Sequence, residues 1–536
     1  MRNYRAFEAA LLGTTPVDPV DPVDPDDPVV AVQGVDLVAF GLKGDGSDET
    51  GMFLMACAEA WAQGHGKIIC TDATRRFKLV DAELTQSLLL DLGGAALVAD
   101  FNGVYASTCA TILKTSKANN VSLTFRNLVI DGQNNGSNPS GAGGHPLLWL
   151  NGGALIEFDH VRVVNGANRD NTVFSNIFDY MDGEVQITDA RRVYAHDSFF
   201  GASPGEILTV QYTGSNPFLA TKLEIERCEF SKNKSNAPAS QWSSSSIVAY
   251  NIGKGSYLRD SIFGQHIKTA CNWFGPGVIE RCRFEGVSDS QALDFDETEK
   301  FGIDQIVVRS CFFQNVMGGY AIRGSARNVI IEDCEINRCQ GGIHIARQVG
   351  SHPIFTGVGV QGARDLYNVW IKNLTSNGND VGDGSTVNSL IRVIGVSEAQ
   401  PIHLYVEGTG VQLSGNHPSA NPEYGIWATN CFLYLKGAFQ HGRTAMFYMD
   451  GFKNVVARDC LFLPQPGATT HLFWLEGGTI DDLVFEDCKV RGALDPGYAH
   501  LRFVNAPTMR GKIYRNRSGD LSIINPNTFT LVTNYG

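Results

Sequence analysis

Two carboxylates stand at alternate positions in the segment ALDFDETEK, residues 292–300. In a strand, the apolar Leu293 and Phe295 would face inward, because successive side chains point to opposite faces. Asp294 and Asp296 would then share the outward face, about 7 Å apart at the backbone. Two such carboxylates can hydrolyse a glycosidic bond, one as the acid and one to activate water or attack. The spacing favours the inverting arrangement, in which the carboxylates stand roughly 6.5–9.5 Å apart.

Further polar and aromatic residues are expected near this pair on the outside of the fold. The candidates for substrate binding are Arg323, His344, Trp273, Asn272, Lys268 and Asp179. Glu206 is a second candidate catalytic carboxylate, in a cluster with Asp179 and Asp182. A merely solvated face is the alternative for each of these carboxylates, because exposed strands often carry acidic residues.

The same residues allow a second chemistry, β-elimination from a uronate-containing polymer. Arg323 or Lys268 would take the proton α to the carboxylate, and Asp294 and Asp296 would hold calcium. The hydrolase needs no cofactor, so calcium is expected only for the lyase. The twelve cysteines form no C-x-x-C pair, which argues against zinc, and we expect them to be small buried hydrophobes.

A repeat in the sequence predicts the fold that would present these residues. Six segments read apolar–x–apolar, two polar residues, then Cys–x–apolar: KLEIERCEF (222–230), GVIERCRF (277–284), QIVVRSCFF (305–313), NVIIEDCEI (328–336), NVVARDCLF (454–462) and DLVFEDCKV (482–490). The Cys position of the same frame is taken by Leu128, Val161, Ser198, Ser261, Leu374, Thr409 and Ala438 elsewhere. Strands this short must stack on neighbours to bury their faces. The pattern predicts an all-β, right-handed, single-stranded parallel β-helix of about 13 or more coils, since the shortest coils cannot hold the four strands of a propeller blade.

A second strand in each coil predicts an outward column of side chains. Its members would be Trp149, Asp179, Thr209, Ala249, Asn272, Asp294, Arg323, His344, Arg392, Trp427, Tyr448, Trp474 and Phe503. Asp, Arg, His and large aromatic residues at such positions are typical of a surface on which rings pack against sugars. The run Trp427, Tyr448 and Trp474 could equally pack at a subunit interface.

The N-terminal region lacks the coil repeat. Residues 1–15 are predicted to form an amphipathic helix, and PVDPVDPVDPDDP (16–28) has the composition of an extended polyproline II spacer. Residues 35–71 predict a strand, a Gly–Asp turn with Asp48 or Glu49 at the start of a helix, a helix from about Thr50 to Ala62, and another strand. Such a helix can cover the open end of a stack of coils.

A Phe-Gly pair, a Gly-Asp-Gly turn and an acidic run precede the predicted helix, formed by Phe40, Gly41, Gly44, Asp45, Gly46, Asp48 and Glu49. These residues resemble the opening motif of the pectate-lyase-like superfamily, found in phage tailspikes and related depolymerases. Membership would imply a trimeric β-helix, an N-terminal virion anchor and action on polysaccharide. The resemblance covers this N-terminal segment and assigns no catalytic residue of the polygalacturonase type.

Together these features predict four regions: a virion-anchoring segment and linker (1–30), a cap and the opening of the β-helix (31–115), the β-helix with its groove (116–510) and its C-terminal end (511–536). The predicted function is that of a phage tailspike that binds and hydrolyses a bacterial surface polysaccharide, with a lyase and a non-catalytic adhesin as alternatives. Expected partners are the polysaccharide, phage tail or adaptor proteins bound through residues 1–30, and two further copies in a homotrimer.

The net charge of −13 argues against a nucleic-acid partner, whose phosphates select basic surfaces. No apolar run is long enough to insert into a membrane, and the N-terminus lacks the features of a signal peptide. We therefore expect a virion tail protein that is made in the host cytoplasm.

Overall fold

The computed structural model describes the chain in segments. These are residues 34–99, 111–133, 146–166, 183–201, 206–231, 245–264, 269–287, 291–295, 305–346, 367–377, 389–412, 424–441, 445–464, 471–491, 500–505, 507–511, 513–516, 523–524 and 531–533. The predicted N-terminal helix and polyproline spacer lie outside these segments.

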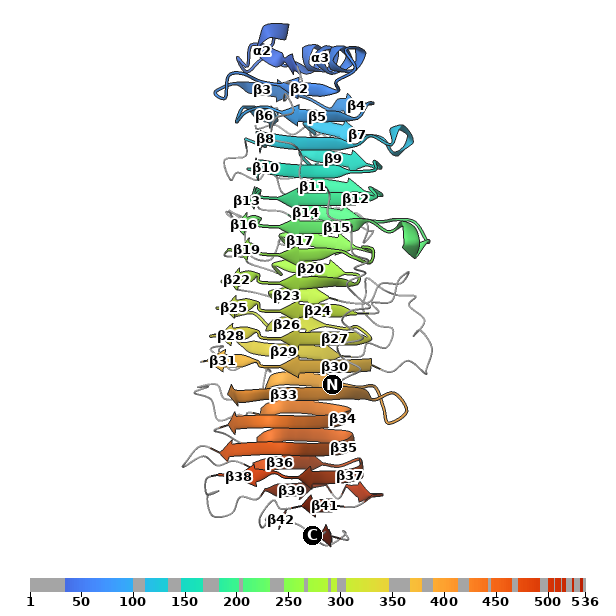
Figure 1. Ribbon diagram of the computed structural model, residues 1–536, viewed down its shortest axis with the longest axis vertical. Coiled ribbons are helices and arrows are strands. Elements are labelled where there is room, and N and C mark those ends of the chain that lie inside the picture. Colours follow the sequence, from blue (N-terminus) through green and yellow to red (C-terminus); the bar gives the residue numbers. More distant parts are fainter. Residues whose placement is uncertain are drawn as a thin grey trace, which may run out of the picture.

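The described segments form a right-handed parallel β-helix, which confirms the predicted fold (Figure 1). The 43 strands of the described segments join into one continuous sheet that winds into a long rod. All pairings between named strands in the described segments are parallel, and most strands pair with the strand three places further along the chain. Each coil therefore contributes one strand to each of three faces, which we call faces I, II and III in chain order.

Face I consists of β4 (Ala82–Leu84), β7 (Leu113–Thr115), β9 (Leu148–Asn151), β11 (Gly183–Thr188), β14 (Glu206–Gln211), β17 (Ile247–Tyr250), β20 (Cys271–Phe274), β23 (Leu293–Phe295), β26 (Tyr320–Gly324), β29 (Gly341–Ala346), β32 (Ser389–Ile394), the first parts of β34 (Tyr424–His441) and β35 (Ala445–Pro464), β36 (His471–Glu476), β39 (Leu501–Val504) and β42 (Ile523–Ile524).

Face II consists of β1 (Val35–Asp36), β2 (Lys67–Ile69), β5 (Leu88–Asp91), the first parts of β8 (Leu123–Asp131) and β10 (Ile156–Val164), β12 (Arg192–His196), β15 (Lys222–Glu226), β18 (Tyr257–Arg259), β21 (Gly277–Glu280), β24 (Ile306–Arg309), β27 (Asn328–Glu332), β30 (Tyr367–Lys372), the first part of β33 (Ile402–Gln412), the middle parts of β34 and β35, β37 (Thr479–Glu486), β40 (Thr508–Met509), β41 (Ile513–Asn516) and β43 (Leu531–Thr533).

Face III consists of β3 (Arg76–Leu79), β6 (Ala96–Ala99), the ends of β8 and β10, β13 (Phe199–Gly201), β16 (Glu229–Ser231), β19 (Ile262–Phe263), β22 (Arg283–Glu285), β25 (Phe312–Gln314), β28 (Glu335–Asn337), β31 (Thr375–Asn377), the ends of β33, β34 and β35, and β38 (Lys489–Val490).

The corner between faces II and III explains why a polar residue recurs before the Cys position of the repeat. The residue just before the Cys position has a positive φ in most coils: Asn127, His160, Asp197, Arg227, Asp260, Arg281, Ser310, Asp333, Asn373, Asp459 and Asp487. Asp and Asn tolerate this left-handed conformation best, which accounts for the polar residue before the Cys position. The six cysteines of the frame are buried free thiols, as predicted.

A ladder of aromatic rings fills the core behind face III. Phe200, Phe230, Phe263, Phe284 and Phe313 occupy the same position in successive coils and are fully buried. Their neighbouring ring centroids lie 4.6–5.3 Å apart in stacked geometry. Because the rings are as far apart as the coils themselves, they hold the coils in line.

Two helices cover the first coils at one end of the rod (Figure 1). Helix α3 (Thr50–Ala62) matches the predicted helix and buries Phe53, Ala56 and Ala60. The preceding strand is shorter than predicted, because Asp36 ends β1 and caps α2 (Leu37–Phe40) by accepting from the Val38 amide at 2.9 Å.

The two acidic residues before α3, Asp48 and Glu49, bind different backbone amides, which the sequence alone did not reveal. Asp48 accepts from the Thr50 amide at 3.0 Å, whereas the buried Glu49 turns back to accept from the amides of Lys43 and Gly44. Asp48 is therefore the residue that serves the helix start, and Glu49 fixes the preceding turn.

Candidate functional site

The strand register places one line of side chains along the outside of face I. This outward column contains Lys114, Trp149, Gln186, Thr209, Val248, Asn272, Asp294, Arg323, His344, Arg392, Trp427, Tyr448, Trp474 and Arg502, each paired with the next. Neighbours in the column are about 4.8 Å apart at the backbone.

Three predicted members of the column are wrong. Gln186 takes the place given to Asp179, because β11 lies at 183–188. Val248 takes the place of Ala249, which faces the core, and Arg502 takes the place of Phe503. In each of these last two strands both alternating sets contain an apolar residue, so the hydrophobic pattern alone did not decide which set faces inward.

Asp294 lies in the middle of the column, as predicted. Its neighbours Leu293 and Phe295 are fully buried, which confirms the alternation in β23. The Oδ1 atom is buried and has no hydrogen-bond partner among the described residues. Burial raises the pKa of Asp294 to about 6, although the positive charge of Arg323 on the next coil acts in the opposite direction.

A cationic segment follows Asp294 on the next coils. Arg323, His344 and Arg392 are adjacent in the column. Burial, together with repulsion from Arg392 and Arg323, lowers the pKa of His344 to about 3, so the ring is neutral between two guanidinium groups. Its Nε2 atom is buried without a partner in the described segments, and its ring packs against Tyr320 at 4.7 Å.

The column continues into an aromatic cluster formed by Tyr424, Trp427, Tyr448 and Trp474. Arg392 lies over the ring of Trp427 at 4.4 Å, and Arg502 lies over Trp474 at 4.0 Å. Arginine on one ring face and aromatic edges around it form an amphipathic surface that suits a sugar polymer.

The remaining predicted site residues have different outcomes. Asn272 lies in the column next to Asp294 and donates to the Ser245 hydroxyl at 2.7 Å. Trp273 is fully buried in the core, so its prediction as a substrate-binding residue is wrong. Glu206 begins β14, three coils before Asp294, and this separation of about 14 Å keeps the two from acting as one pair. Its side chain, and Asp296, Lys268 and Asp179, lie outside what the structure describes.

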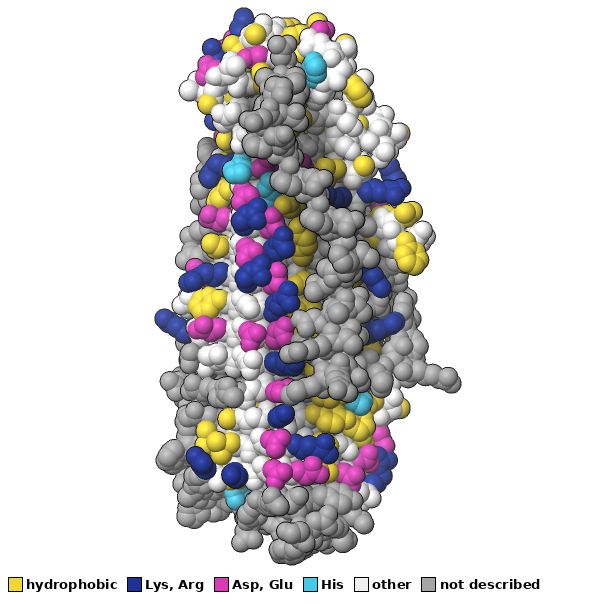
Figure 2. Space-filling view, viewed as in Figure 1, with side chains coloured by type: hydrophobic (Ala, Val, Ile, Leu, Met, Phe, Trp, Pro, Cys, Tyr) yellow, Lys and Arg dark blue, Asp and Glu magenta, His cyan; other side chains and the backbone are white. Residues whose placement is uncertain are grey.

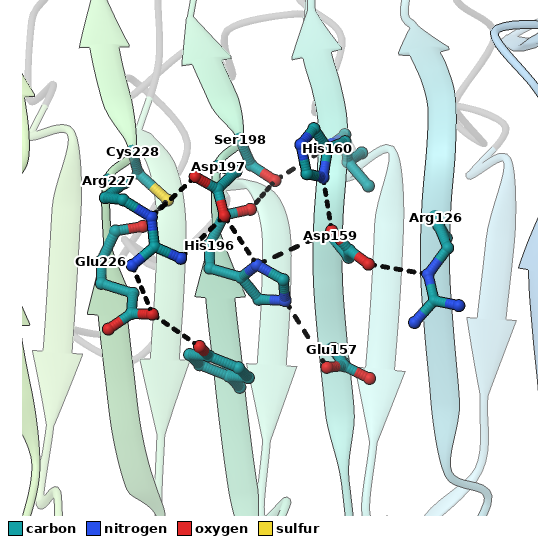
Figure 3. Close-up of polar contacts among 12 residues, drawn as sticks. Arg126, Glu157, Asp159, His160, His196, Asp197, Ser198, Glu226, Arg227 and Cys228 are labelled. Carbon is teal, nitrogen blue, oxygen red and sulfur yellow. Dashed lines mark hydrogen bonds and ion pairs between the residues drawn. The ribbon is translucent and has the colours of Figure 1, made fainter. Parts of the chain in front are cut away.

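Face II carries a second polar network, which the sequence reading missed (Figure 3). His196 lies among three carboxylates, with its ring nitrogens 3.0 Å from Asp197 and 3.6 Å from both Glu157 and Asp159. Glu226 accepts from the Tyr194 hydroxyl and from Arg227, both at 2.7 Å. These bonds outweigh the effect of burial and lower the pKa of Glu226 to about 2.

This network belongs to a longer charge ladder along the rod, visible as alternating basic and acidic side chains in Figure 2. The strand register pairs Asp91, Arg126, Asp159, His196, Glu226, Arg259, Glu280, Arg309, Glu332, Lys372, Glu407 and Lys436 in this order. Basic and acidic side chains alternate along this register, so the carboxylates within the ladder have basic neighbours, and we interpret the ladder as stabilising rather than catalytic. Its detection requires the alignment of whole coils.

No group of three His, Cys, Asp or Glu side chains in the described segments is arranged to bind a metal ion. No helix in those segments is both long and apolar enough to cross a membrane.

No protein-family model and no curated protein matches this sequence. Among solved structures, the chain is similar to tailspike protein 3 of bacteriophage CBA120, with 12% identity, a TM-score of 0.32 and coverage of 92% of this chain. The chain spans 62% of that tailspike's length. It is also similar to the surface adhesin PfbA of Streptococcus pneumoniae (11% identity, TM-score 0.30, covering 92% of this chain and 93% of that one).

A third similar structure is the A-module of the Azotobacter vinelandii mannuronan C-5 epimerase AlgE6, with 11% identity, a TM-score of 0.17 and coverage of 94% of this chain and 99% of that one. At this level of similarity the function has to be inferred from the side chains of the site itself.

Proposed function

We propose that the protein is a tailspike depolymerase that binds a bacterial surface polysaccharide along the outward column of face I and hydrolyses it at Asp294. One observation carries the proposal. A partly buried carboxyl with a pKa of about 6 and one buried, unpartnered oxygen lies next to a row of cations and aromatic rings. Such a carboxyl is suited to general acid catalysis, and such a row is suited to holding a sugar polymer.

In this mechanism Asp294 donates its proton to the glycosidic oxygen as the bond breaks. Asp296, two residues further along the chain, would activate the attacking water, and this role rests on its position in the sequence. Arg323 would orient the sugar next to the cleaved bond. The aromatic cluster would bind sugars several coils away.

The test is cleavage of candidate capsular polysaccharides and O-antigens, followed by the size of the products and the release of reducing ends. Asp294→Asn should lower turnover at least about a hundredfold while the polymer still binds. Asp260→Asn is the matched control, because Asp260 lies at a left-handed corner, where Asn is equally tolerated, and pairs with Arg281. Full activity of Asp294→Asn would overturn the assignment and leave Glu206 as the next candidate.

A lyase is the second candidate, and the two guanidinium groups of Arg323 and Arg392, two coils apart in the column, favour it. Guanidinium groups can neutralise a uronate carboxylate, Arg323 or Lys268 would take the α-proton, and Asp294 and Asp296 would hold calcium. The elimination would leave a conjugated double bond in the product, which ultraviolet absorbance detects, and a chelator would abolish a calcium-dependent reaction. A non-catalytic adhesin would retain the polymer and release no new ends.

The proposed setting is the tail of a phage particle. Residues 1–30 would bind phage tail or adaptor proteins, and the chain would form a homotrimer that presents three binding columns to the polysaccharide. Deletion of residues 1–30 should then leave an active protein that no longer joins particles. Continued assembly of the truncated protein onto particles would contradict the anchor.

A further inference from the structure

Buried polar atoms without partners gather on one stretch of face I. From β29 to β36 they are His344 Nε2, Ser389 Oγ, Arg392 Nε, Trp427 Nε1, Asp450 Oδ1 and Trp474 Nε1, with partners sought among the described residues. Buried polar groups in native proteins are nearly always hydrogen-bonded, by protein, water or ligand. The Arg and Trp atoms of this set can only donate. A ligand that satisfies them must therefore supply acceptors.

The arginines of this stretch are also unlike those of face II. Arg126, Arg259 and Arg309 on face II each bind a carboxylate of the charge ladder. Arg323 and Arg392 form no ion pair with any described residue, and Arg392 stacks on Trp427 instead. Arg502 stacks on Trp474, and its guanidinium lies 3.0 Å from the Nε2 atom of His471. Asp294 is the acidic neighbour of Arg323 in the column, but none of the three arginines forms an ion pair with a described residue, in a chain of net charge −13.

The positions of these cations follow the coil repeat. Arg323 and Arg392 are two coils apart, about 10 Å, and Arg392 and Arg502 are four coils apart, about 19 Å. Trp427 and Trp474 occupy coils between the last two arginines. One coil rises by about 4.8 Å, which is close to the length of one pyranose ring in an extended polymer. All three cations therefore fall on every second sugar or a multiple of it.

We propose that face I from β26 to β39 binds an anionic polysaccharide in which acidic sugars alternate with uncharged ones. The acidic groups lie at Arg323, Arg392 and Arg502, and uncharged rings pack on Trp427 and Trp474. Carboxylate, sulfate and phosphate substituents share the chemistry that these guanidinium groups recognise. The inference rests on the proposed function only in taking the ligand to be a polysaccharide, since it requires no cleavage.

Binding is measured in the Asp294→Asn background, so that no polymer is consumed. The probes are hyaluronan and chondroitin, in which uronates alternate with uncharged sugars, chondroitin sulfate as the sulfated form, polygalacturonate with a charge on every sugar, and neutral dextran. We expect the alternating polymers to bind most tightly, with an affinity that falls as salt rises. Tighter binding of chondroitin sulfate than chondroitin would identify sulfate as the preferred group.

Arg392→Gln and Arg502→Gln should each weaken binding of the alternating polymers at least about tenfold, since each loses one charge-assisted contact. Arg392→Lys keeps the charge and should restore most of the affinity. The matched control is Arg283→Gln on face III, where the guanidinium pairs with Glu285. Thermal unfolding of each variant shows whether the fold is retained.

The proposal is overturned if dextran binds as well as the alternating polymers, if none of the anionic probes binds, or if the two Gln variants match the control. Charge-selective binding by a protein that never cleaves any polymer would sustain this inference and remove only the hydrolase. Cleavage of a neutral polymer with unchanged activity in both Gln variants would sustain the hydrolase and contradict the binding of an anionic polymer.

Discussion

Asp294 ionises in a place where the negative charge is poorly solvated. Its pKa is raised to about 6 by burial, above the ordinary value of 3.8. A raised carboxyl pKa means that folding favours the protonated form, so this contribution to stability is complete below pH 3.8 and is lost as pH rises through about 6.

The Asn variant carries no such charge. We expect Asp294→Asn to be more stable than the natural protein at pH 7, by up to about 3 kcal/mol, and to match it near pH 4. Denaturant unfolding at both pH values measures the difference. The Asp260→Asn control should show no gain at pH 7, because Asp260 is held ionised by Arg281. An equal gain in both variants would show that burial of Asp294 is not the cause.

The same pKa predicts the pH dependence of activity. If Asp294 is the acid, kcat/KM should fall as pH rises through about 6, because the reactive form is protonated. His344, with its pKa lowered to about 3, should add no limb between pH 5 and 8. A pH profile of His344→Asn should therefore keep the limb near pH 6, even where the rate itself is lower. Loss of that limb in the His344 variant would assign it to the histidine.

At this scale the sequence located some residues and misplaced others for a physical reason. Asp294, Arg323 and His344 were found because an apolar residue precedes each of them and an apolar residue or Gly follows, which fixes the side that faces out. Trp273 was misplaced because aromatic residues are used both in cores and on sugar-binding surfaces. The arginine stacked on Trp427 and the buried unpartnered atoms depend on contacts between coils, which a single sequence does not reveal.

At the scale of the element, the left-handed corners make a direct prediction. Ser310 adopts φ +52° at a position that Asp or Asn occupies in most coils. Ser310→Asn should raise stability by about 0.5–1 kcal/mol, and Ser310→Val should lower it by about 1–2 kcal/mol, because a β-branched residue is strained there. Thermal unfolding separates the two variants. A loss of stability in Ser310→Asn would show that the left-handed backbone conformation at this corner does not determine the stability of the coil.

The charge ladder makes a second prediction for the elements of face II. The nearly buried Glu226 bonds to Tyr194, Arg227 and Arg259, so Glu226→Gln should cost about 2–3 kcal/mol. Because the pKa of Glu226 is lowered to about 2, its contribution is complete above pH 4.5 and is lost as pH falls through about 2. The difference between the natural protein and the variant should shrink over that range. Glu285→Gln, an exposed pair with Arg283, should change stability by less than about 0.5 kcal/mol.

The elements were more predictable than the contacts between them. The Cys frame located the strands of face II and the corner, because the buried slot and the left-handed residue recur together. The strand β11 was missed because its coil contains the long stretch around Asp179, which shifted the expected second strand. The charge ladder requires the register of all coils at once, and loops of unequal length hide that register in the sequence.

At the scale of the whole molecule, two different outer surfaces of the rod are candidates for the subunit interface. Face I carries the cations and the aromatic cluster. Face II carries, beside its charge ladder, an apolar column of Val278, Val307, Ile330, Trp370, Tyr405, Tyr434, Val456 and Val484. An apolar line of this length on an outer surface is typical of an interface.

Phe503, which the sequence placed in the outward column, is buried in the core, so a charge there would unfold the coil rather than separate subunits. A test of assembly is therefore made on face II. Tyr405 stacks between Trp370 and Tyr434, at ring distances of 5.4 and 4.5 Å, in the middle of the apolar column.

We predict that the chain of 58.2 kDa forms a homotrimer through this column and that Tyr405→Asp converts it to monomers, as light scattering at micromolar concentration would show. A charge at Tyr405 would have to be desolvated against the same column of a neighbouring rod, which opposes association. Trp427→Asp on face I is the matched control: it should leave the trimer intact and weaken polysaccharide binding. If Trp427→Asp separates the subunits and Tyr405→Asp does not, the aromatic cluster is the interface. A natural protein that is monomeric under these conditions would contradict the trimer on either face.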